Sequence, residues 1–412
     1  MRHPIQMQAH LRAPAARRWQ DILSLDDLAP VARKHLPAPI FGYIASGADS
    51  TQALANNLRA FEQFELLTRV LVDVGQVHCE TTLFGQTWRT PVGIAPIGLS
   101  ALSAYRGDLV LAQAASAQGV PMIMSGSSLI PMEEVARQSP HTWFQAYLPG
   151  SPEQVQALIA RVKNAGFQTL VITVDTQAQP KLEFAKRCGF NAPLRPSLAL
   201  ALEGLQHPRW LLGTFLRTIC KHGLPHFENN HAHRGAAILS KNVAWDFSER
   251  GRNDWARLKA IHAMWPGRLI LKGILHPADA RLAREHGVDG IIVSNHGGRQ
   301  LDSAPAPLRM LPAVVEQAGD MPVMLDGGVR RGTDVIKALA LGARLVFVGR
   351  PCIYAVALGG AAGVEFALNL LRDEIIRAMA MMGVNRTTEI TASSLLPCDT
   401  RWLAAPGQKT PH

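Results

Sequence analysis

Short apolar runs rich in β-branched residues alternate along the chain with longer amphipathic stretches. Gly, Pro or Asn bounds most of the runs, and several stretches begin with Pro and end just before Gly, as helices prefer. This alternation is typical of parallel βα units. We predict strands at residues 92–95, 121–125, 142–147, 169–175, 268–273, 290–295, 322–327 and 345–349, and helices at residues 109–118, 152–165, 255–264, 277–285, 307–317 and 333–340.

Eight parallel strands with helices between them predict a (β/α)8 barrel, or TIM barrel, whose chemistry lies on loops at the carboxyl ends of the strands. Polar residues stand where the apolar runs stop, among them Gln145, Lys272 and His296. A doubly wound fold would need a G-x-G-x-x-G motif early in the chain, and the sequence has none. The barrel is therefore the predicted fold.

A long insertion after the fourth strand interrupts this pattern, because residues 176–250 contain no clear strand. Connections inside a barrel are usually a few residues long, so an insertion of this size is normally functional or mobile. A basic amphipathic helix within it could lie in an anionic membrane interface or pack on the flank of the barrel, and the sequence leaves both open. At 100° per residue, one face of this helix carries Leu211, Leu212, Phe215, Leu216 and Ile219, and the opposite face carries Arg217 and Lys221.

These patterns divide the chain into a barrel domain at residues 26–390, with the insertion at 176–250, and two flanking segments. The first 25 residues are basic and superficially resemble an organelle transit peptide, but the first 20 contain no serine, so we interpret them as a flexible arm. Residues 391–412 form a C-terminal tail.

Composition narrows the class of protein. With 412 residues, 47% hydrophobic and 18% charged, the chain is typical of a globular enzyme, and we expect no membrane-spanning helix. Five cysteines without a C-x-x-C pair suggest neither disulfides nor a zinc site, and a reducing compartment follows. The net charge of +10 fits anionic small molecules or a membrane surface better than nucleic acid, since no basic run is interleaved with aromatic residues.

Two motifs carry candidate chemistry. In SNHGGRQLD, residues 294–302, His296 could take a proton from a hydroxyl group, and Arg299 could grip a carboxylate with two hydrogen bonds. In the stretch from LDGGVRRGTD to VFVGRP, residues 325–351, glycines follow two consecutive strands beside Arg330 and Arg350. Phosphate groups often bind after the last two strands of this barrel, so a phosphorylated cofactor or substrate is indicated.

With these two motifs, FGYIASGAD, APIGLSALSAYRGD, FQAY, ITVDT and LILKG, the chain from about residue 28 to 390 resembles the FMN-dependent 2-hydroxy acid oxidase and dehydrogenase family. That family includes glycolate oxidase, L-lactate dehydrogenase and mandelate dehydrogenase. The resemblance implies FMN as the cofactor, with no metal, and Lys272 beside the flavin ring, where a cation favours the reduced flavin. It implies that FMN is held by Ala95, Pro96, Ile97, Ser125, Gln145, Thr173, Lys272, Ser294, Asp326, Gly327, Gly328, Arg330, Gly349 and Arg350.

The resemblance also implies the substrate site. His296 is the catalytic base, Asp175 stabilises its charged form, and Tyr43, Tyr147 and Arg299 bind the substrate. Either His296 takes the hydroxyl proton while the α-hydride passes to the flavin, or it takes the α-proton and a carbanion delivers the electrons. The expected reaction is oxidation of an L-2-hydroxy acid, similar to lactate or mandelate, to a 2-oxo acid.

One position departs from the family. A second carboxylate-binding arginine usually follows the fourth strand, and here Leu182 occupies that position. Lys181 could substitute for it, a mobile loop could bring in Arg187, or the substrate is not an ordinary small 2-hydroxy acid. Losing the charged hydrogen bond should cost about 2–3 kcal/mol of carboxylate binding.

The insertion bears on the electron acceptor. Its run LEGLQHPRWLLGTFLR is similar to the segment with which membrane-associated lactate and mandelate dehydrogenases dock at a bilayer. Gly98 also matches the dehydrogenases, since oxidases commonly have alanine there. We therefore expect a quinone or cytochrome acceptor in preference to oxygen, a cytoplasmic location or a peripheral one on the inner face of the cytoplasmic membrane, and a homo-tetramer.

Three hypotheses remain. The first is the 2-hydroxy acid dehydrogenase. The second keeps FMN but changes the substrate, and Leu182 motivates it. The third is a non-catalytic protein that binds flavin or phosphate at the membrane surface, and the complete set of His296, Arg299, Asp175 and Lys272 argues against it.

Overall fold

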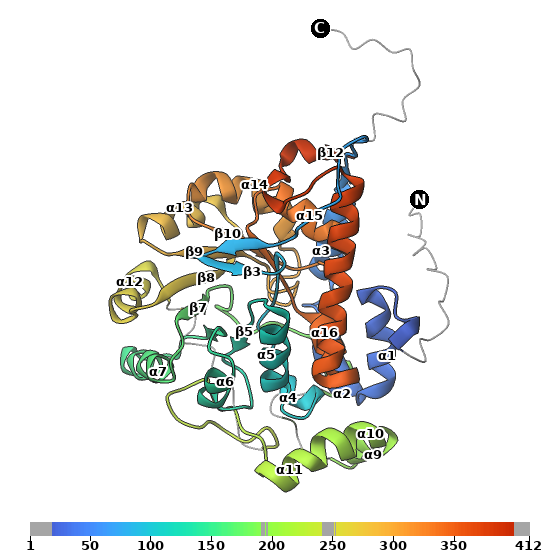
Figure 1. Cartoon of the computed structure of the whole chain (residues 1–412). Coiled ribbons are helices and arrows are strands. Elements are labelled where there is room, and N and C mark those ends of the chain that lie inside the picture. The colour runs from blue at the N-terminus through green and yellow to red at the C-terminus, as the bar shows by residue number, and fades with distance from the viewer. Residues whose placement is uncertain (1–18, 191–193, 195–196, 241–250, 252, 399–412) are drawn as a thin grey trace, which may run out of the picture.

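The computed structural model describes residues 19–190, 194, 197–240, 251 and 253–398. Its main sheet confirms all eight predicted strands, each within the predicted range to within a residue or two, and helices surround it (Figure 1). The strands are β4 (Val92–Ile94), β5 (Ile123–Ser125), β6 (Trp143–Ala146), β7 (Thr169–Thr173), β8 (Arg268–Ile274), β9 (Gly290–Val293), β10 (Val323–Asp326) and β11 (Leu345–Val348).

The sheet closes into a barrel. Its strand order is β4-β11-β10-β9-β8-β7-β6-β5, and every neighbouring pair is parallel. The two ends of this order meet, because Ile94 N donates to Pro121 O over 2.9 Å and Ile94 pairs with Met122. The predicted (β/α)8 barrel is therefore confirmed.

A compact cluster of side chains fills the barrel and is closed at the amino ends of the strands by a hairpin, β2 (Thr81–Leu83) and β3 (Gln86–Trp88). Phe84, in the turn, contacts Trp143 with ring centroids 6.0 Å apart, and its carbonyl accepts from Arg268. Since Trp143 and Arg268 begin their strands, the hairpin covers the end opposite the catalytic loops. The buried residues are Leu83, Trp88, Ala95, Ile123, Trp143, Val171, Ile270, Ile292, Met324, Leu345 and Phe347.

Helices cover the outside of the barrel, and a second, larger apolar cluster lies between them and the sheet. The six predicted helices are confirmed. Local sequence explains their starts: Ser151 Oγ accepts from Gln154 N, and Pro152 occupies the first helical position of α7. The outer helices are α5 (Gly107–Gln118), α6 (Met132–Gln138), α7 (Pro152–Asn164), α12 (Trp255–Met264), α13 (Pro277–Glu285), α14 (Pro307–Ala318), α15 (Gly332–Ala340) and α16 (Arg350–Met381).

Helix α16 is longer than any helix that the sequence patterns predicted. By length and composition it could cross a membrane, although 61% of its most apolar stretch is buried inside the protein. It packs against α1 (Leu28–His35), α5 and α15, as Figure 1 shows for the long red helix. The apolar character of α16 thus accompanies packing on three neighbouring helices.

Segments before and after the barrel belong to the same fold. They comprise α2 (Ala38–Ala45), α3 (Gln52–Arg59), β1 (Phe64–Leu66) and β12 (Leu395–Pro397), with short 3-10 turns between, whereas α4 (Ser100–Ser103) lies within the barrel between β4 and α5. Trp19 packs on Phe366 with ring centroids 5.2 Å apart, and β1 pairs with β12. The described fold therefore includes residues on both sides of the predicted boundaries at 26 and 390. Residues 1–18 of the predicted arm and 399–412 of the predicted tail lie outside the described residues.

The described part of the insertion is helical, with α8 (Glu183–Arg187), α9 (Leu198–Gln206), α10 (Pro208–Trp210), a π-helix (Leu211–Leu216) and α11 (Arg217–His222). The apolar residues predicted to share one face differ in their exposure. Trp210, Thr214 and Thr218 are buried, whereas Leu212 and Leu216 are exposed. A π-helix bonds residue i to i+5, so the 100° spacing used for the prediction does not hold across it.

Candidate active site

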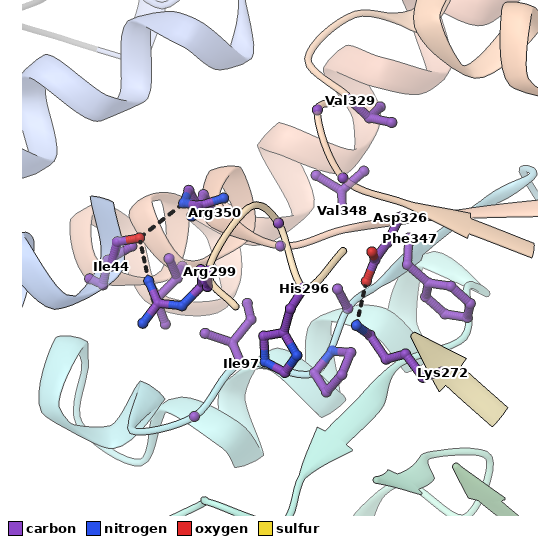
Figure 2. Close-up of a pocket in the computed structure, with 18 of the residues that line it drawn as sticks. Ile44, Ile97, Lys272, His296, Arg299, Asp326, Val329, Phe347, Val348 and Arg350 are labelled. Atoms are coloured by element: carbon purple, nitrogen blue, oxygen red, sulfur yellow. Dashed lines mark hydrogen bonds and ion pairs between the residues drawn. The ribbon is translucent and has the colours of Figure 1, made fainter. Parts of the chain in front are cut away.

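A cavity of about 800 Å³ opens at the carboxyl ends of the strands. Most of the predicted site residues line it, and Figure 2 shows their side chains converging there from separate strands and loops. They are Tyr43, Ala95, Pro96, Ile97, Tyr147, Lys272, His296, Arg299, Asp326, Gly327, Gly328, Arg330, Gly349 and Arg350.

His296 and Asp175 form a pair at the mouth of the cavity. Nδ1 of His296 lies 3.0 Å from Oδ1 of Asp175, and Nε2 lies 3.4 Å from the hydroxyl of Tyr147. Burial raises the pKa of the Asp175 carboxyl, but the charge and hydrogen bond of His296 and the charge of Lys272 outweigh it and lower that pKa overall. An ionised carboxylate only accepts, so Nδ1 donates to it, and the neutral form of His296 would present the lone pair of Nε2 to the cavity.

The backbone holds His296 in a conformation that few side chains adopt. Its φ is +58°, and Gly297 and Gly298 follow with φ of +66° and +73°. A β-carbon at Gly298 would lie 2.5 Å from the backbone nitrogen of Leu54, so only glycine fits there. Such strain at a functional residue requires strong support from neighbouring structure.

That support comes from helix α3 and the loop that precedes it. Asn57 and Asn295, both buried, exchange two amide hydrogen bonds of 2.8 and 2.7 Å. Asp302 accepts from the backbone nitrogens of Ser50 and Ala53, each over 3.0 Å. These bonds tie the loop that carries His296 and Arg299 to the segment after Tyr43.

Lys272 is a buried cation with two partners. Its Nζ lies 2.9 Å from Oδ2 of Asp326 and 2.9 Å from Oγ of Ser294. Figure 2 shows this ion pair between the lysine and the aspartate as a dashed line. Ser294 Oγ also accepts from His296 N, so this cation is connected to the catalytic loop.

Two arginines share backbone carbonyls at the other side of the cavity. Arg299 Nη1 donates to Tyr43 O over 2.7 Å and to Ser46 O over 2.9 Å, while Arg350 donates to Ile44 O and Ser46 O. Burial and repulsion from Arg299 and Arg330 lower the pKa of Arg350 to about 9, so its guanidinium stays charged at neutral pH. Two of these neighbouring cations, Arg330 and Arg350, provide a site for a phosphate.

Buried polar atoms without a partner test whether FMN fits. Among the described residues they include Gln145 Nε2, Thr173 Oγ1 and Asp326 Oδ1, all on residues predicted to hold the flavin ring or ribityl chain. Buried polar groups are rarely left unpaired, so these three indicate a polar ligand. At Gly349, beside Arg350, a β-carbon would lie 3.7 Å from that of Ala95, so a side chain there would fill the space above the strand ends. The residues present fit FMN.

Five predicted residues lie behind the lining. Asp175, Ser125, Gln145, Thr173 and Ser294 are on or directly after the barrel strands and are not on the cavity surface. Ser125 Oγ donates to Gln145 Oε1 over 3.3 Å, which orients the amide of Gln145. All five occupy the strand ends that the sequence predicted.

Lys181 is the exception. The structure does not bring it to the cavity: its side chain is 71% exposed and pairs with Glu183 at 2.7 Å. The flexible ammonium group of Lys181 pairs with the carboxylate two residues later in the chain. The position of Lys181 in the sequence did not reveal this pairing. The prediction that Lys181 replaces the missing arginine is not supported.

Sequence reasoning missed several lining residues, namely Ile44, Val329, Val348 and Ile353. They are apolar and stand among other apolar residues, so no local signal separates them from core positions. It also missed Asn57, whose partner Asn295 is 238 positions away.

Comparisons with known proteins bear on the whole chain. Residues 32–397 match the family described as FMN-dependent dehydrogenase. An L-lactate dehydrogenase of Azorhizobium caulinodans is 38% identical over 380 residues, which cover 91% of this chain and 98% of the relative.

Solved structures of related enzymes also match this chain. The monotopic membrane protein (S)-mandelate dehydrogenase matches with a TM-score of 0.82 and 32% identity, covering 91% of this chain and 99% of the other. An arginine-to-leucine variant of mandelate oxidase, solved with 2-hydroxy-phenylacetamide, matches with a TM-score of 0.74 and 33% identity, covering 91% and 98%.

Proposed function

The chain belongs to the FMN-dependent dehydrogenase family, and on this basis we propose that it oxidises the 2-hydroxyl group of a 2-hydroxy acid, or of a close derivative, to a 2-oxo group. It is an FMN-dependent oxidoreductase. The observation that carries the proposed reaction is the His296–Asp175 pair, 3.0 Å apart, at the mouth of a cavity whose floor holds Lys272.

Bound FMN supplies an acceptor for two electrons. The protein supplies the base: Nε2 of His296 takes a proton from the substrate, and Asp175 stabilises the imidazolium that results. Arg299 and the hydroxyl of Tyr43 hold the acyl group, while Tyr147 lies within 3.4 Å of His296 Nε2 and orients the substrate hydroxyl. Lys272 offers a positive charge to the flavin, which favours its reduced form.

Anaerobic mixing with substrates tests this proposal. Purified holoenzyme should lose its visible flavin absorbance when mixed with (S)-mandelate, L-lactate, or an ester or amide of either. His296→Ala should slow this loss by at least a thousandfold while binding of phenylacetate, which cannot react, stays within about fivefold. If none of a broad panel of 2-hydroxy compounds bleaches the flavin, the proposal fails.

The panel includes amides because of the mandelate oxidase variant. That protein was solved with 2-hydroxy-phenylacetamide, so a structure similar to this one accommodates an amide where mandelate has a carboxylate. In this chain, too, a leucine, Leu182, stands where the family usually has an arginine.

We propose further that the protein binds a membrane peripherally. Five leucines on α9 and the following π-helix, Leu198, Leu202, Leu205, Leu212 and Leu216, are 39–77% exposed and form what we call the leucine patch. The exposed cations Arg209, Arg217 and Lys221 lie on the adjoining helices α10 and α11. Apolar side chains with basic neighbours suit an anionic bilayer surface, and (S)-mandelate dehydrogenase of similar fold is a monotopic membrane protein.

An apolar cavity behind the leucine patch supports a lipid-soluble electron acceptor. It has a volume of about 770 Å³ and is lined by Leu200 and Trp210 of the patch helices and by Ile40 of α2. Tyr43, three residues after Ile40, lines the flavin cavity, so one helix borders both spaces. We therefore propose a membrane quinone as the acceptor.

Vesicle sedimentation and reoxidation kinetics test these two points. The double variant Leu202→Ser, Leu205→Ser should lose binding to phosphatidylglycerol vesicles, whereas Leu23→Ser, at a more exposed leucine outside the patch, should not. A short-chain ubiquinone should reoxidise the reduced enzyme faster than oxygen does. Faster reoxidation by oxygen would identify an oxidase, and reoxidation only by a cytochrome would replace the quinone.

Family resemblance also motivates a homo-tetramer. Light scattering after size-exclusion chromatography in detergent-free buffer measures this directly. A monomer of 44.8 kDa would refute it.

A further inference from the structure

We propose that the substrate is a neutral 2-hydroxy acyl compound, an ester or amide of a 2-hydroxy acid, and that Leu182 sets this preference. The inference rests on the oxidation proposed above and concerns only the group bonded to the reacting carbon. The inference depends on which cations the fold places at the substrate site and which cations it places elsewhere.

Position 182 lies in the wall beside the substrate tyrosine. Helix α8, which starts directly after Leu182, packs on α2, which carries Tyr43. Phe190, just beyond α8, stacks near Tyr43 with ring centroids 4.6 Å apart. Asp49 N donates to Lys181 O over 2.8 Å, which fixes the residue before Leu182 to the loop after α2.

The cations of this wall point elsewhere. Glu183 pairs with Lys181 at 2.7 Å and with Arg187 at 3.0 Å, and both side chains are more than 70% exposed. Lys186 is also exposed. Leu182 itself is half-buried and packs against the apolar core. Within the described residues of α8 and its start, no cation reaches the cavity.

Most cations that line the cavity are assigned to other groups, and Arg299 is only partly occupied. Lys272 pairs with Asp326, and Arg350 and Arg330 lie at the side that we assign to the phosphate. Of the lining residues that the structure describes, Arg299 is the guanidinium left for the acyl group. Its Nη1 already donates to Tyr43 O and Ser46 O, so one edge of one guanidinium remains.

A carboxylate needs more than this edge. It brings a full charge and two oxygens, and none of the cations described on α8 or at its start reaches the cavity to meet the second oxygen. A buried charged acceptor that loses a partner binds about ten- to hundredfold more weakly. An ester or amide presents one carbonyl oxygen to Arg299 and places an uncharged group beside Leu182, so it avoids this loss.

The reaction balances in the same way for a neutral substrate. The 2-hydroxy carbon loses its hydrogen and the hydroxyl loses its proton, and a C=O double bond forms where the C–OH bond was single. Two electrons and one proton pass to FMN, and the second proton passes to Nε2 of His296. The acyl group remains intact, so the product is a 2-oxo ester or amide.

Calorimetry on the holoenzyme separates binding from chemistry. The probes are phenylacetate and methyl phenylacetate, which lack the reacting hydroxyl, and the reactive pair is (S)-mandelate and methyl (S)-mandelate. We expect the native protein to bind methyl phenylacetate at least tenfold more tightly than phenylacetate. Leu182→Arg should reverse this order, and Leu182→Met, the control of similar volume, should keep it. The ratio of kcat/KM for the reactive pair should follow the same changes.

Tighter binding of the acid by the native protein would overturn the inference, as would an unchanged preference in Leu182→Arg. If that variant does not fold, two measurements replace it. The ratio of the two affinities in the native protein should favour the ester, and Leu182→Gln should reduce that preference. If (S)-mandelate bleaches the flavin and its ester does not, the neutral substrate is refuted while the proposed oxidation stands. If the ester binds more tightly but neither compound bleaches the flavin, the proposed oxidation fails and the preference for a neutral ligand stands.

Discussion

Asn57 and Asn295 hold each other through two reciprocal amide hydrogen bonds, 2.8 and 2.7 Å long, beneath the catalytic loop. Asn57→Ala would leave the Asn295 amide buried without this partner, at a cost of about 1–3 kcal/mol of unfolding free energy. Urea denaturation of the holoenzyme measures the loss. Asn56→Ala, at the half-exposed neighbour, is the matched control, and equal losses in both variants would contradict the role of the pair.

The carboxylate behind His296 should matter for turnover more than for binding. Asp175→Asn keeps the volume but can donate to Nδ1, which moves the proton of His296 to Nε2 and removes the lone pair that accepts a proton. We expect kcat to fall by roughly a hundredfold to ten-thousandfold, as when a buried aspartate is removed from other catalytic histidines. The dissociation constant of a non-reacting analogue should stay within about threefold. A kcat within tenfold of the native value would show that Asp175 does not set the tautomer.

A buried carboxyl that does not line the cavity makes stability depend on pH. Burial raises the pKa of Asp108 from 3.8 to about 6, so the folded protein binds a proton that the unfolded chain has released between about pH 4 and 6. Stability therefore falls as pH rises through this window, by about 3 kcal/mol in total. Asp108→Asn should be more stable than the native protein at pH 7.5 and equally stable near pH 4.

Urea titrations at several pH values measure this difference. Asp279→Asn, in the first turn of α13 and half-exposed, is the control and should not become more stable as pH rises. A constant difference between Asp108→Asn and the native protein from pH 4 to 7.5 would contradict the raised pKa.

Gly98 leaves room for the substrate tyrosine. A β-carbon at this position would lie 3.0 Å from the hydroxyl of Tyr43 and 3.2 Å from Cβ of Ser127. Gly98→Ala should therefore displace the Tyr43 hydroxyl and weaken binding of a non-reacting analogue severalfold, with little change in stability. Gly213→Ala, where a β-carbon meets no atom within 4 Å, should bind the analogue normally. Unchanged binding in Gly98→Ala would show that Tyr43 does not contact the acyl group.

The barrel could be predicted because its strands are buried on both faces, so each appears in the sequence as an apolar run that stops at a Gly, Pro or polar residue. The residues at those stops, such as Gln145 and Lys272, follow from the same rule, since the carboxyl ends of all the strands face one side. Motif resemblance then assigned expected roles to the side chains.

Other features depend on contacts that no local pattern reveals. Strands β1 and β12 pair across more than 300 residues, and the second of them lies beyond the predicted boundary at 390. The π-helix changed which leucines of residues 211–216 face solvent. The side chain of Lys181 points toward Glu183 and away from the cavity. The sequence alone does not show which of these two directions it takes.

The left-handed backbone from His296 to Gly298 and the leucine at position 182 belong to separate loops, and this separation has an evolutionary consequence. The first loop tolerates almost no substitution, because each of its residues is fixed by backbone conformation or by a neighbouring chain segment. Position 182, at the start of a short helix, has an ordinary backbone conformation and a half-buried side chain. Under the role proposed for Leu182, a single codon change there would exchange one class of substrate for another without disturbing the geometry that moves the proton.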